Sequence, residues 1–184
     1  MPSSCENDVA VRPPAGDVLQ DILRPGLKLV FVGTAAGRRS AAMKAYYAHP
    51  SNRFWRTLAS TGLTPRLFLP GEESALLGHG IGLTDIAKTA AGMDHQIVKS
   101  AFDVAGFNEK ILRYAPRAVA FTSKKAASIW LGMRTSKFTF GRQEQNLAGP
   151  TAVFVLPSTS GAASRTWDID HWHRIAAWHR SDTR

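Results

Sequence analysis

The sequence predicts an α/β fold: a three-layer α/β/α sandwich with a central, mostly parallel sheet. Short hydrophobic runs alternate along the chain with segments of helical periodicity, the pattern expected when helices cover both faces of a parallel sheet. With 184 residues, of which 44% are hydrophobic, the chain can bury a sizeable core in one domain. We expect that domain over residues 17–184, after a flexible, polar and proline-rich tail over residues 1–16.

The first half of the chain is expected to supply two strands. Residues 16–23 have helical spacing and precede Pro25-Gly26, which predicts a short helix that stops there. The first central strand is expected over 28–32, with a glycine-flanked turn over 33–37 and a disordered-looking basic segment after it. The further elements are helices over 52–61 and 72–78 and a short strand or turn over 80–88.

The second half continues the alternation of helix and strand. Apolar spacing predicts helices over 100–114 and 124–131. Buried strands are expected over 117–122 and 151–156, where short apolar runs are bounded by polar residues. A last helix, rich in Trp and His, is expected over 169–179.

The net charge favours a polyanionic partner. Lys and Arg number 23 against 14 Asp and Glu, which gives a formal charge of +9. Such a surface binds nucleic acid through phosphate contacts that weaken with salt and carry no sequence preference. The alternative is an ordinary soluble basic protein. No apolar run reaches the roughly 18 residues of a membrane span, so we expect no membrane partner.

The chain contains a single cysteine, Cys5, within the polar tail. One thiol excludes an internal disulfide, and an iron–sulfur cluster ordinarily needs four thiolates. We therefore expect a reducing location: cytoplasmic and nucleoid-associated, as in bacteria, or otherwise intracellular.

Three glycine-rich segments, 33–37, 80–88 and 157–165, lie where loops are expected to leave the sheet. In a parallel sheet the loops at the carboxyl ends of the strands converge on one edge. Glycine also lets a flat ligand approach the backbone closely. Each segment alone can be an ordinary turn, but together they predict one ligand site.

Four motifs occur in order along the chain. They are Gly33-Thr34-Ala35-Ala36-Gly37, Tyr47 with Ala48-His49-Pro50-Ser51-Asn52-Arg53-Phe54-Trp55, Gly80-Ile81-Gly82-Leu83-Thr84, and Leu156-Pro157-Ser158-Thr159-Ser160-Gly161-Ala162-Ala163-Ser164-Arg165. This series resembles the mismatch-specific uracil-DNA glycosylase and thymine-DNA glycosylase branch of the uracil-DNA glycosylase superfamily, with the last motif one residue longer here. The resemblance covers Asp21 to Arg165. It implies a uracil-DNA glycosylase-like fold and a DNA-repair enzyme that extrudes its target nucleotide.

The chain departs from the resembled family at one position. The family has an asparagine that positions the attacking water where this chain has Ala35, which carries no polar group. Our candidate catalytic residue is Asp85, which follows Thr84 in a segment expected to face the same pocket. A carboxylate can orient and deprotonate water and can stabilise a cationic sugar. The alternative is an aspartate that caps a turn or helix and pairs with Lys88.

The resemblance also implies how the extruded base would be held. Gly33, Thr34 and Ala35 would line the base pocket, with the backbone amides of Thr34 and Tyr47 reading the base edge. Tyr47 would stack on the pyrimidine, and Ser158 would add a donor for the charge that develops on the leaving base. Alternatively, Tyr47 is a core aromatic and Ser158 an ordinary turn residue.

Two more residues of the second motif have candidate roles. Asn52 is a candidate substrate contact, although its place before a predicted helix favours a helix cap or a loop brace. His49 is expected to be structural rather than a general acid.

The segment 160–165 would enter the duplex in the resembled enzymes. After Ser160, its tip, Gly161-Ala162-Ala163, is small, so a bulky plug for the vacated base position is absent. Arg165 would reach a phosphate or the opposite base, and its alternative is a salt bridge at a turn.

Two basic groups flank the expected pocket. Arg38, Arg39 and Lys44 follow the first turn, and Lys124 and Lys125 follow the strand that ends near residue 122. Both groups are candidates for phosphate contacts, with a solvated basic face as the alternative.

The last helix carries His171, His173 and His179 among its tryptophans. Residues two apart point to different sides of a helix, so His171 and His173 are poor joint ligands. We predict that they pack structurally and do not hold zinc.

Together these observations predict a monofunctional DNA glycosylase. It would hydrolyse the N-glycosidic bond of uracil in DNA by base flipping, with other deaminated or damaged bases as further candidates. No metal or other cofactor is needed, and no lysine is clearly placed for a lyase step. The partner would be DNA containing uracil or a related lesion, bound by a monomer. Two alternatives remain: a catalytically silent nucleic-acid-binding member of the same fold, and an enzyme that acts on free nucleosides or nucleotides.

Overall fold

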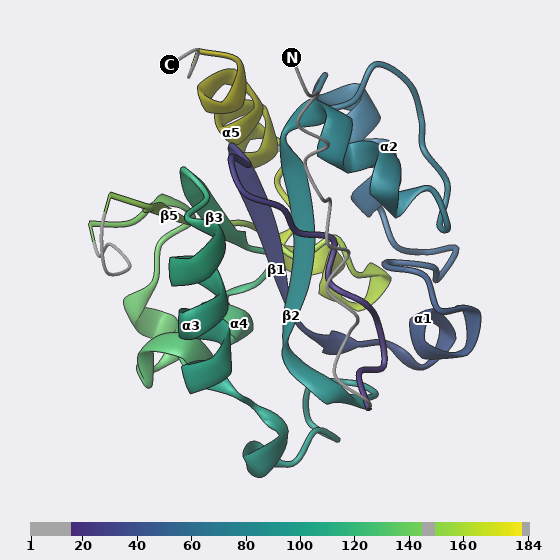
Figure 1. Ribbon diagram of the computed structural model, residues 1–184, viewed down its shortest axis with the longest axis vertical. Helices are drawn as coiled ribbons and strands as arrows, with labels where there is room; N and C mark the ends of the chain where they lie inside the picture. Colours follow the sequence, from purple (N-terminus) through teal and green to yellow (C-terminus); the bar gives the residue numbers. More distant parts are fainter. Residues whose placement is uncertain (1–15, 145–149, 182–184) are drawn as a thin grey trace, which may run out of the picture.

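The computed structural model, which describes residues 16–144 and 150–181, is built around a five-stranded sheet (Figure 1). The strand order is β2-β1-β3-β5-β4; the β4–β5 pairing is antiparallel, and the other three pairings between these strands are parallel. The strands are β1 (Leu29–Ala36), β2 (Ile81–Ala91), β3 (Ala118–Phe121), β4 (Gly141–Arg142) and β5 (Ala152–Val155). The predicted α/β fold with a mostly parallel sheet is confirmed.

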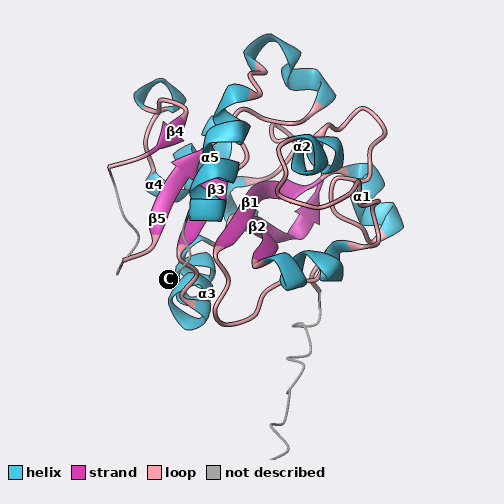
Figure 2. Cartoon of the chain, turned by 90° about the horizontal axis from the view of Figure 1, so that it is seen from above, coloured by secondary structure: helices cyan, strands magenta, loops and turns pink. Residues whose placement is uncertain are grey.

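Helices cover both faces of the sheet, as the view from above shows (Figure 2). The α-helices are α1 (Arg38–Met43), α2 (Phe54–Ser60), α3 (Val104–Tyr114), α4 (Lys124–Leu131) and α5 (Asp170–Ser181). The 3₁₀ helices are η1 (Glu73–His79), η2 (Lys99–Ala101), η3 (Thr135–Lys137) and η4 (Gly161–Thr166). The structure is therefore the predicted three-layer sandwich.

The central strand β1 contributes to two separate cores, because successive residues of a strand point to opposite faces. Phe31 packs against Phe54 of α2 and Trp172 of α5, with 5.4 Å between ring centroids in each pair. Val30 lies in the other core, which α3 and α4 cover. Burial on both faces explains why this part of the sequence is a continuous hydrophobic run.

The strands β1 and β2 are longer than the sequence predicted. β1 continues to Ala36, and its Gly33 and Ala35 pair with Asp85 and Ala87 of β2. The prediction of a turn over 33–37 is therefore wrong, and the segment 80–88 lies almost wholly in a long strand. Pairing in the sheet satisfies backbone N–H and C=O groups that a buried turn would leave without partners.

Residues 16–23 form no helix, contrary to the prediction. The amide of Val18 donates to the carbonyl of Lys88 over 2.7 Å, and Ile22 and Leu83 exchange two backbone hydrogen bonds of 2.9 and 3.0 Å. The segment thus runs along the outer edge of β2 and satisfies groups that an edge strand would expose. A helix of two turns is too short to compete with this pairing.

The basic segment after β1 was predicted to look disordered, but it forms helix α1. The hydroxyl of Ser40 accepts a hydrogen bond from the amide of Ala48 over 3.1 Å, which ties α1 to the segment that follows. The helix ends at Lys44, which has a left-handed backbone with φ of 52°. Elsewhere the predictions are closer: α4 has the bounds predicted for it, and α2 lies inside 52–61.

The predicted tail over 1–16 lies, apart from Gly16, outside the described residues, and so does Cys5. Among the residues that are described, no helix combines the length and the apolar character needed to cross a membrane.

Candidate functional site

A cavity of about 870 Å³ opens where the parallel strands β1, β2, β3 and β5 end. The three glycine-rich segments singled out in the sequence meet here, as the topology of a parallel sheet requires. They contribute residues 33–37, Asp85 and residues 158–163. The remaining lining comes from 38–40, Tyr46, Tyr47, His49, Ser51, Asn52, 92–96, 122–124, Leu19, Phe140 and Thr166.

Asp85 lies in the buried wall of this cavity and is 5% exposed. It pairs with Gly33 of β1, where a Cβ would overlap the carboxylate Oδ1 and lie 3.7 Å from the hydroxyl of Tyr47. Only glycine leaves this space. Among the described residues no donor hydrogen-bonds the carboxylate, although its oxygens are not sealed from the cavity. The group is therefore placed to bind water or a ligand.

Burial raises the pKa of the Asp85 carboxyl to about 6. Lys88 and Lys110 lower this pKa, whereas the carboxylates Asp21 and Asp94 raise it. The group is therefore mostly charged at neutral pH yet binds a proton far more readily than an exposed aspartate. A pKa close to the operating pH is what general-base catalysis requires.

An ion cluster holds the segment of β2 around Asp85. The Nζ of Lys88 lies 2.8 Å from Oδ1 of Asp21, and Lys110 of α3 pairs with the other carboxylate oxygen. The hydroxyl of Thr84 donates to Asp21 over 2.6 Å. Lys88 thus pairs with Asp21, and the ion pair considered as the alternative role of Asp85 does not form.

Tyr47 is both packed against the core and part of the cavity wall. Its ring stacks on Phe54, with 3.8 Å between centroids and 18° between planes, and its hydroxyl lies 3.5 Å from the hydroxyl of Thr122. Its backbone is left-handed, with φ of 52°. Such a conformation costs a residue with a side chain about 1–3 kcal/mol and is kept where surrounding contacts hold it.

The side chains of Asn52 and His49 line the cavity but have structural partners. Oδ1 of Asn52 accepts a hydrogen bond from the amide of Phe54 over 2.9 Å, the loop brace that its position favoured. Nδ1 of His49 lies 2.7 Å from the hydroxyl of Ser51. Both residues therefore shape the entrance to α2.

The η4 loop forms another wall of the cavity, through Ser158, Ser160, Gly161 and Ala162. The hydroxyl of Ser158 accepts from the amide of Ser160 over 3.3 Å, and Ser160 accepts from the amide of Ala162 over 3.4 Å. Gly161 packs directly on Ser51, whose Oγ would lie 2.6 Å from a Cβ at this position. The small residues at the tip thus let the loop lie close to the segment before α2.

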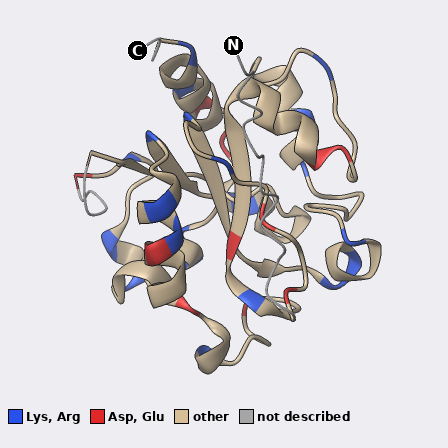
Figure 3. Cartoon of the chain, viewed as in Figure 1, with Lys and Arg blue, Asp and Glu red and all other residues tan. Residues whose placement is uncertain are grey.

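The predicted basic contacts divide into two groups. Arg38, Arg39 and Lys124 line the cavity, whereas Lys44, Lys125 and Arg165 do not. Lys and Arg also occur on α3 and α4, so positive charge is not confined to the cavity (Figure 3). The expectation that no lysine is clearly placed in the pocket is wrong for Lys124, whose Nζ lies 4.6 Å from the centroid of the Phe140 ring.

Sequence reasoning missed the segment 92–96, which lines the cavity after β2. The amide of Gly92 donates to the carbonyl of Ala36 over 2.9 Å, so the segment is tied to the end of β1. Asp94 brings a second carboxylate, hydrogen-bonded to Thr34, and burial raises its pKa. Nothing in the sequence signals this proximity, because it follows from the pairing of two long strands.

The histidines of α5 are separated in space. His171 lies 3.6 Å from the carboxylate of Asp168, His173 is exposed, and His179 is buried with Nε2 3.0 Å from the carbonyl of His79. Over residues 16–144 and 150–181, no group of three or more His, Cys, Asp or Glu side chains could hold a metal ion.

Fold and site together define an α/β protein with a deep cavity at the carboxyl edge of its sheet, lined by a buried carboxylate and an aromatic ring. The family model described as the uracil DNA glycosylase superfamily matches residues 20–180, and the chain belongs to that superfamily. The placement in the mismatch-specific branch stays a prediction.

A solved structure supports the same fold. It is the solution NMR structure of a "putative Uracil DNA glycosylase" from Methanosarcina acetivorans, which superimposes with a TM-score of 0.60 at 21% sequence identity. The match covers 88% of this chain and 96% of that one.

Proposed function

We propose that the chain is a DNA glycosylase that hydrolyses the N-glycosidic bond of uracil in DNA, with Asp85 as the group that activates water. Membership of the superfamily supports a glycosylase. The observation that carries the assignment to Asp85 is its position: a buried carboxylate against Gly33 in the wall of the cavity, with no hydrogen-bond donor among the residues that the structure describes.

The proposed reaction has one bond-breaking and one bond-forming event. The bond from the anomeric carbon of the sugar to the base nitrogen breaks, and the base leaves with the electron pair as an anion. Water adds its oxygen to the anomeric carbon, and Asp85 accepts the proton that this water loses. The carboxylate also stabilises the cationic sugar between these events. The proton then passes to solvent or to the departed base.

The cavity offers partners for an extruded base. One face of Tyr47 is covered by Phe54, so the base would stack on the other face of the ring. Gly33, Thr34 and Ala35 would form the pocket wall, and Ser158 would donate to the leaving base. Arg38, Arg39 and the tip of η4 would contact the DNA around the extruded nucleotide, with Arg38 and Arg39 on its phosphates.

A uracil-containing oligonucleotide tests this proposal. The protein is incubated with the labelled strand, and hot alkali then breaks the strand wherever a base has been removed. We expect strand breaks with the wild type and a rate reduced by about 10²–10⁴-fold for Asp85→Asn, the range by which general-base catalysis accelerates a reaction. Glu109→Gln, the same change at an exposed carboxylate on α3, is the matched control and should act like the wild type.

The outcomes separate the alternatives. Unchanged turnover by Asp85→Asn would remove the catalytic assignment. Binding of the oligonucleotide without strand breaks by the wild type would favour the catalytically silent DNA-binding protein, which the absence of an amide at Ala35 makes the second candidate. Release of uracil from free deoxyuridine as fast as from DNA would favour a nucleoside enzyme.

A further inference from the structure

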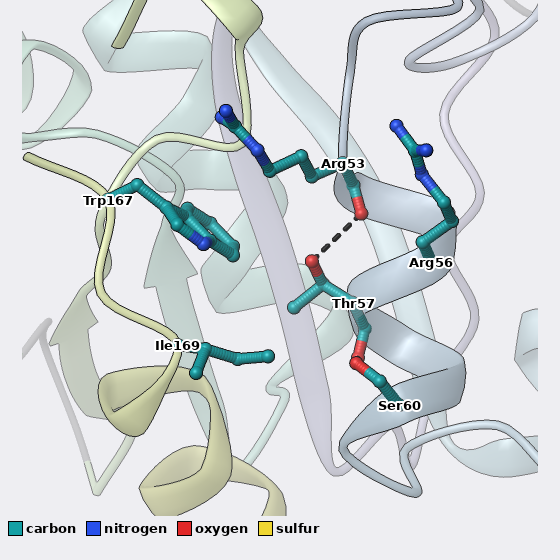
Figure 4. A pocket seen from close by; sticks show the side chains of 6 residues that line it. All are labelled: Arg53, Arg56, Thr57, Ser60, Trp167 and Ile169. Carbon is teal, nitrogen blue, oxygen red and sulfur yellow. Dashed lines mark hydrogen bonds between the residues drawn. The ribbon is translucent and has the colours of Figure 1, made fainter. Parts of the chain in front are cut away.

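A second hollow, of about 320 Å³, lies between α2 and the segment that joins η4 to α5 (Figure 4). Arg53, Arg56, Thr57 and Ser60 line it from the helix side, and Trp167 and Ile169 line it from the other. We call this hollow the Arg–Trp groove. No residue of the cavity that contains Asp85 belongs to its lining.

The Arg–Trp groove carries unneutralised positive charge. Arg53 donates to the carbonyl of Ser160 over 3.4 Å, and Arg56 to the carbonyl of Pro50 over 3.4 Å. Neither guanidinium forms an ion pair with a carboxylate among the described residues, and no acidic residue lines the groove. The nearby Asp168 is engaged with His171 and the amide of Asp170. An anionic ligand in the groove would therefore meet two cations, and none of the residues that line the groove carries a carboxylate.

Trp167 gives the groove an aromatic wall. Its indole is only partly buried, and the guanidinium carbon of Arg53 lies 5.3 Å from the ring centroid. Figure 4 shows the Arg53 side chain extending from α2 toward Trp167, so that its guanidinium group lies over the indole. An aromatic face beside arginines is the combination that binds nucleotides, because the base stacks on the ring while guanidinium groups contact phosphate.

The groove is continuous with the proposed DNA-binding loop. Arg53 contacts this loop twice, through its side chain at Ser160 and through its amide, which donates to the carbonyl of Thr159 over 2.9 Å. Trp167 directly follows the last residue of η4. The η4 loop therefore has the catalytic cavity on one side and the Arg–Trp groove on the other, and one strand that crosses the loop could reach both.

We propose that the Arg–Trp groove binds a nucleotide of the DNA strand that carries the extruded base, a short distance along that strand. Its base stacks on Trp167 and its phosphate contacts Arg56, while Arg53 keeps the loop and the indole in place. The inference rests on the proposed function only in requiring that the chain binds DNA.

Binding of an undamaged single-stranded oligonucleotide tests the groove without any need for catalysis. We expect Trp167→Ala to weaken binding by about 5- to 150-fold, the range for loss of one stacked base. Arg56→Ala should weaken binding uniformly and reduce the slope of log affinity against log salt by about one phosphate contact. The matched control is Arg113→Ala on α3, an exposed arginine that also lies over an aromatic ring, that of Tyr114.

A scan along the strand locates the contact. A non-cleavable 2′-fluorinated deoxyuridine fixes the register, and each flanking nucleotide in turn is replaced by a propyl spacer. With the wild type, one position should show a loss of affinity, and in Trp167→Ala that loss should vanish. Trp167→Phe, which keeps a ring against Trp172, should retain part of it and controls for unfolding.

The binding and cleavage results together decide between the groove and the proposed function. The proposal is overturned if Arg56→Ala and both Trp167 variants bind undamaged DNA as tightly as Arg113→Ala, or if the spacer effect persists in Trp167→Ala. If the groove variants weaken DNA binding while the wild type releases no uracil, the groove stands and the proposed function fails. If the wild type releases uracil and the groove variants bind DNA as the wild type does, the proposed function stands and the groove proposal fails.

Discussion

Asp21 and Asp85 are two largely buried carboxylates beside the same stretch of β2, and their environments are opposite. The carboxylate of Asp21 forms ion pairs with Lys88 and Lys110 and accepts a hydrogen bond from the hydroxyl of Thr84. Asp85 faces a cavity with no protein donor among the described residues. Burial alone would raise both pKa values, but the two lysines lower the pKa of Asp21 below its usual value, whereas that of Asp85 rises to about 6.

The two environments have opposite consequences for the stability of the folded chain. A paired carboxylate stabilises the folded state as long as it remains ionised. An unpaired carboxylate in a buried wall costs stability, and such a cost is characteristic of functional sites. The cluster around Asp21 therefore holds β2 in place next to Asp85, the residue that we propose activates water.

The largest loss of activity is expected from a substitution at Gly33, the residue of β1 that pairs with Asp85. In Gly33→Ala the new methyl group would overlap Oδ1 of Asp85 and force the carboxylate to move. We expect single-turnover uracil release to fall by at least about 10²-fold, because a displacement of about 1 Å at a reacting group has effects of this size. Gly37→Ala, where a Cβ meets nothing within 4 Å, is the control and should have a much smaller effect. Equal rates for the two variants would contradict this arrangement of Gly33 and Asp85.

Removal of the paired carboxylate should cost stability rather than chemistry. Asp21→Ala leaves the ammonium groups of Lys88 and Lys110 without their counter-charge. We expect the free energy of unfolding to fall by about 2–4 kcal/mol, somewhat below the value for a fully buried pair because the Asp21 side chain is 21% exposed. Urea titration followed by circular dichroism measures the change, with Glu109→Ala as an exposed control. A loss no greater than the control's would mean that the cluster contributes little.

Neutralising the Asp85 carboxylate should raise the free energy of unfolding, whereas removing that of Asp21 lowers it. In Asp85→Asn the cost of burying a charge disappears, and the raised pKa of about 6 corresponds to a gain of about 1–3 kcal/mol in unfolding free energy at pH 7. The same urea titration measures this gain, and a decrease in stability would show that the carboxylate has a stabilising partner. Together with the loss of activity, such a gain would mark a residue kept for function.

Lowering the pH should affect Asp85 and Asp21 differently, the first through the rate of uracil release and the second through the stability of the fold. Asp85 must be ionised to accept a proton, so the single-turnover rate should fall as pH drops through about 6, by roughly tenfold at pH 5. Its raised pKa means that the folded state binds the proton more tightly, so its contribution to stability is lost as pH rises through about 6. Asp21, with a lowered pKa, contributes stability above the unfolded pKa that is lost as pH falls. A rate that does not change between pH 5 and 7 would exclude Asp85 as the base.

The fold was accessible from the sequence where local patterns are strong. The strand at β1 and the helices α2 and α4 follow from hydrophobic periodicity and from polar or glycine residues at their ends. The helix predicted over residues 16–23 does not form. Its helical spacing is a local signal, whereas the structure of this segment is set by backbone pairing with Leu83 and Lys88, far along the chain. Pairing with the edge of a strand therefore outweighs local helix propensity in this segment.

The sequence by itself determined which elements line the cavity: glycine-rich segments at the ends of parallel strands, which must converge on one edge, Tyr47 before α2, and the aspartate at position 85. Only the tertiary structure decided which charges are paired. Lys88 could have formed an ion pair with Asp85, but the edge segment brings Asp21 to Lys88 instead, and among the described residues Asp85 forms no ion pair. Charge pairing and burial depend on distances between segments remote in sequence, and no periodicity along the chain encodes them.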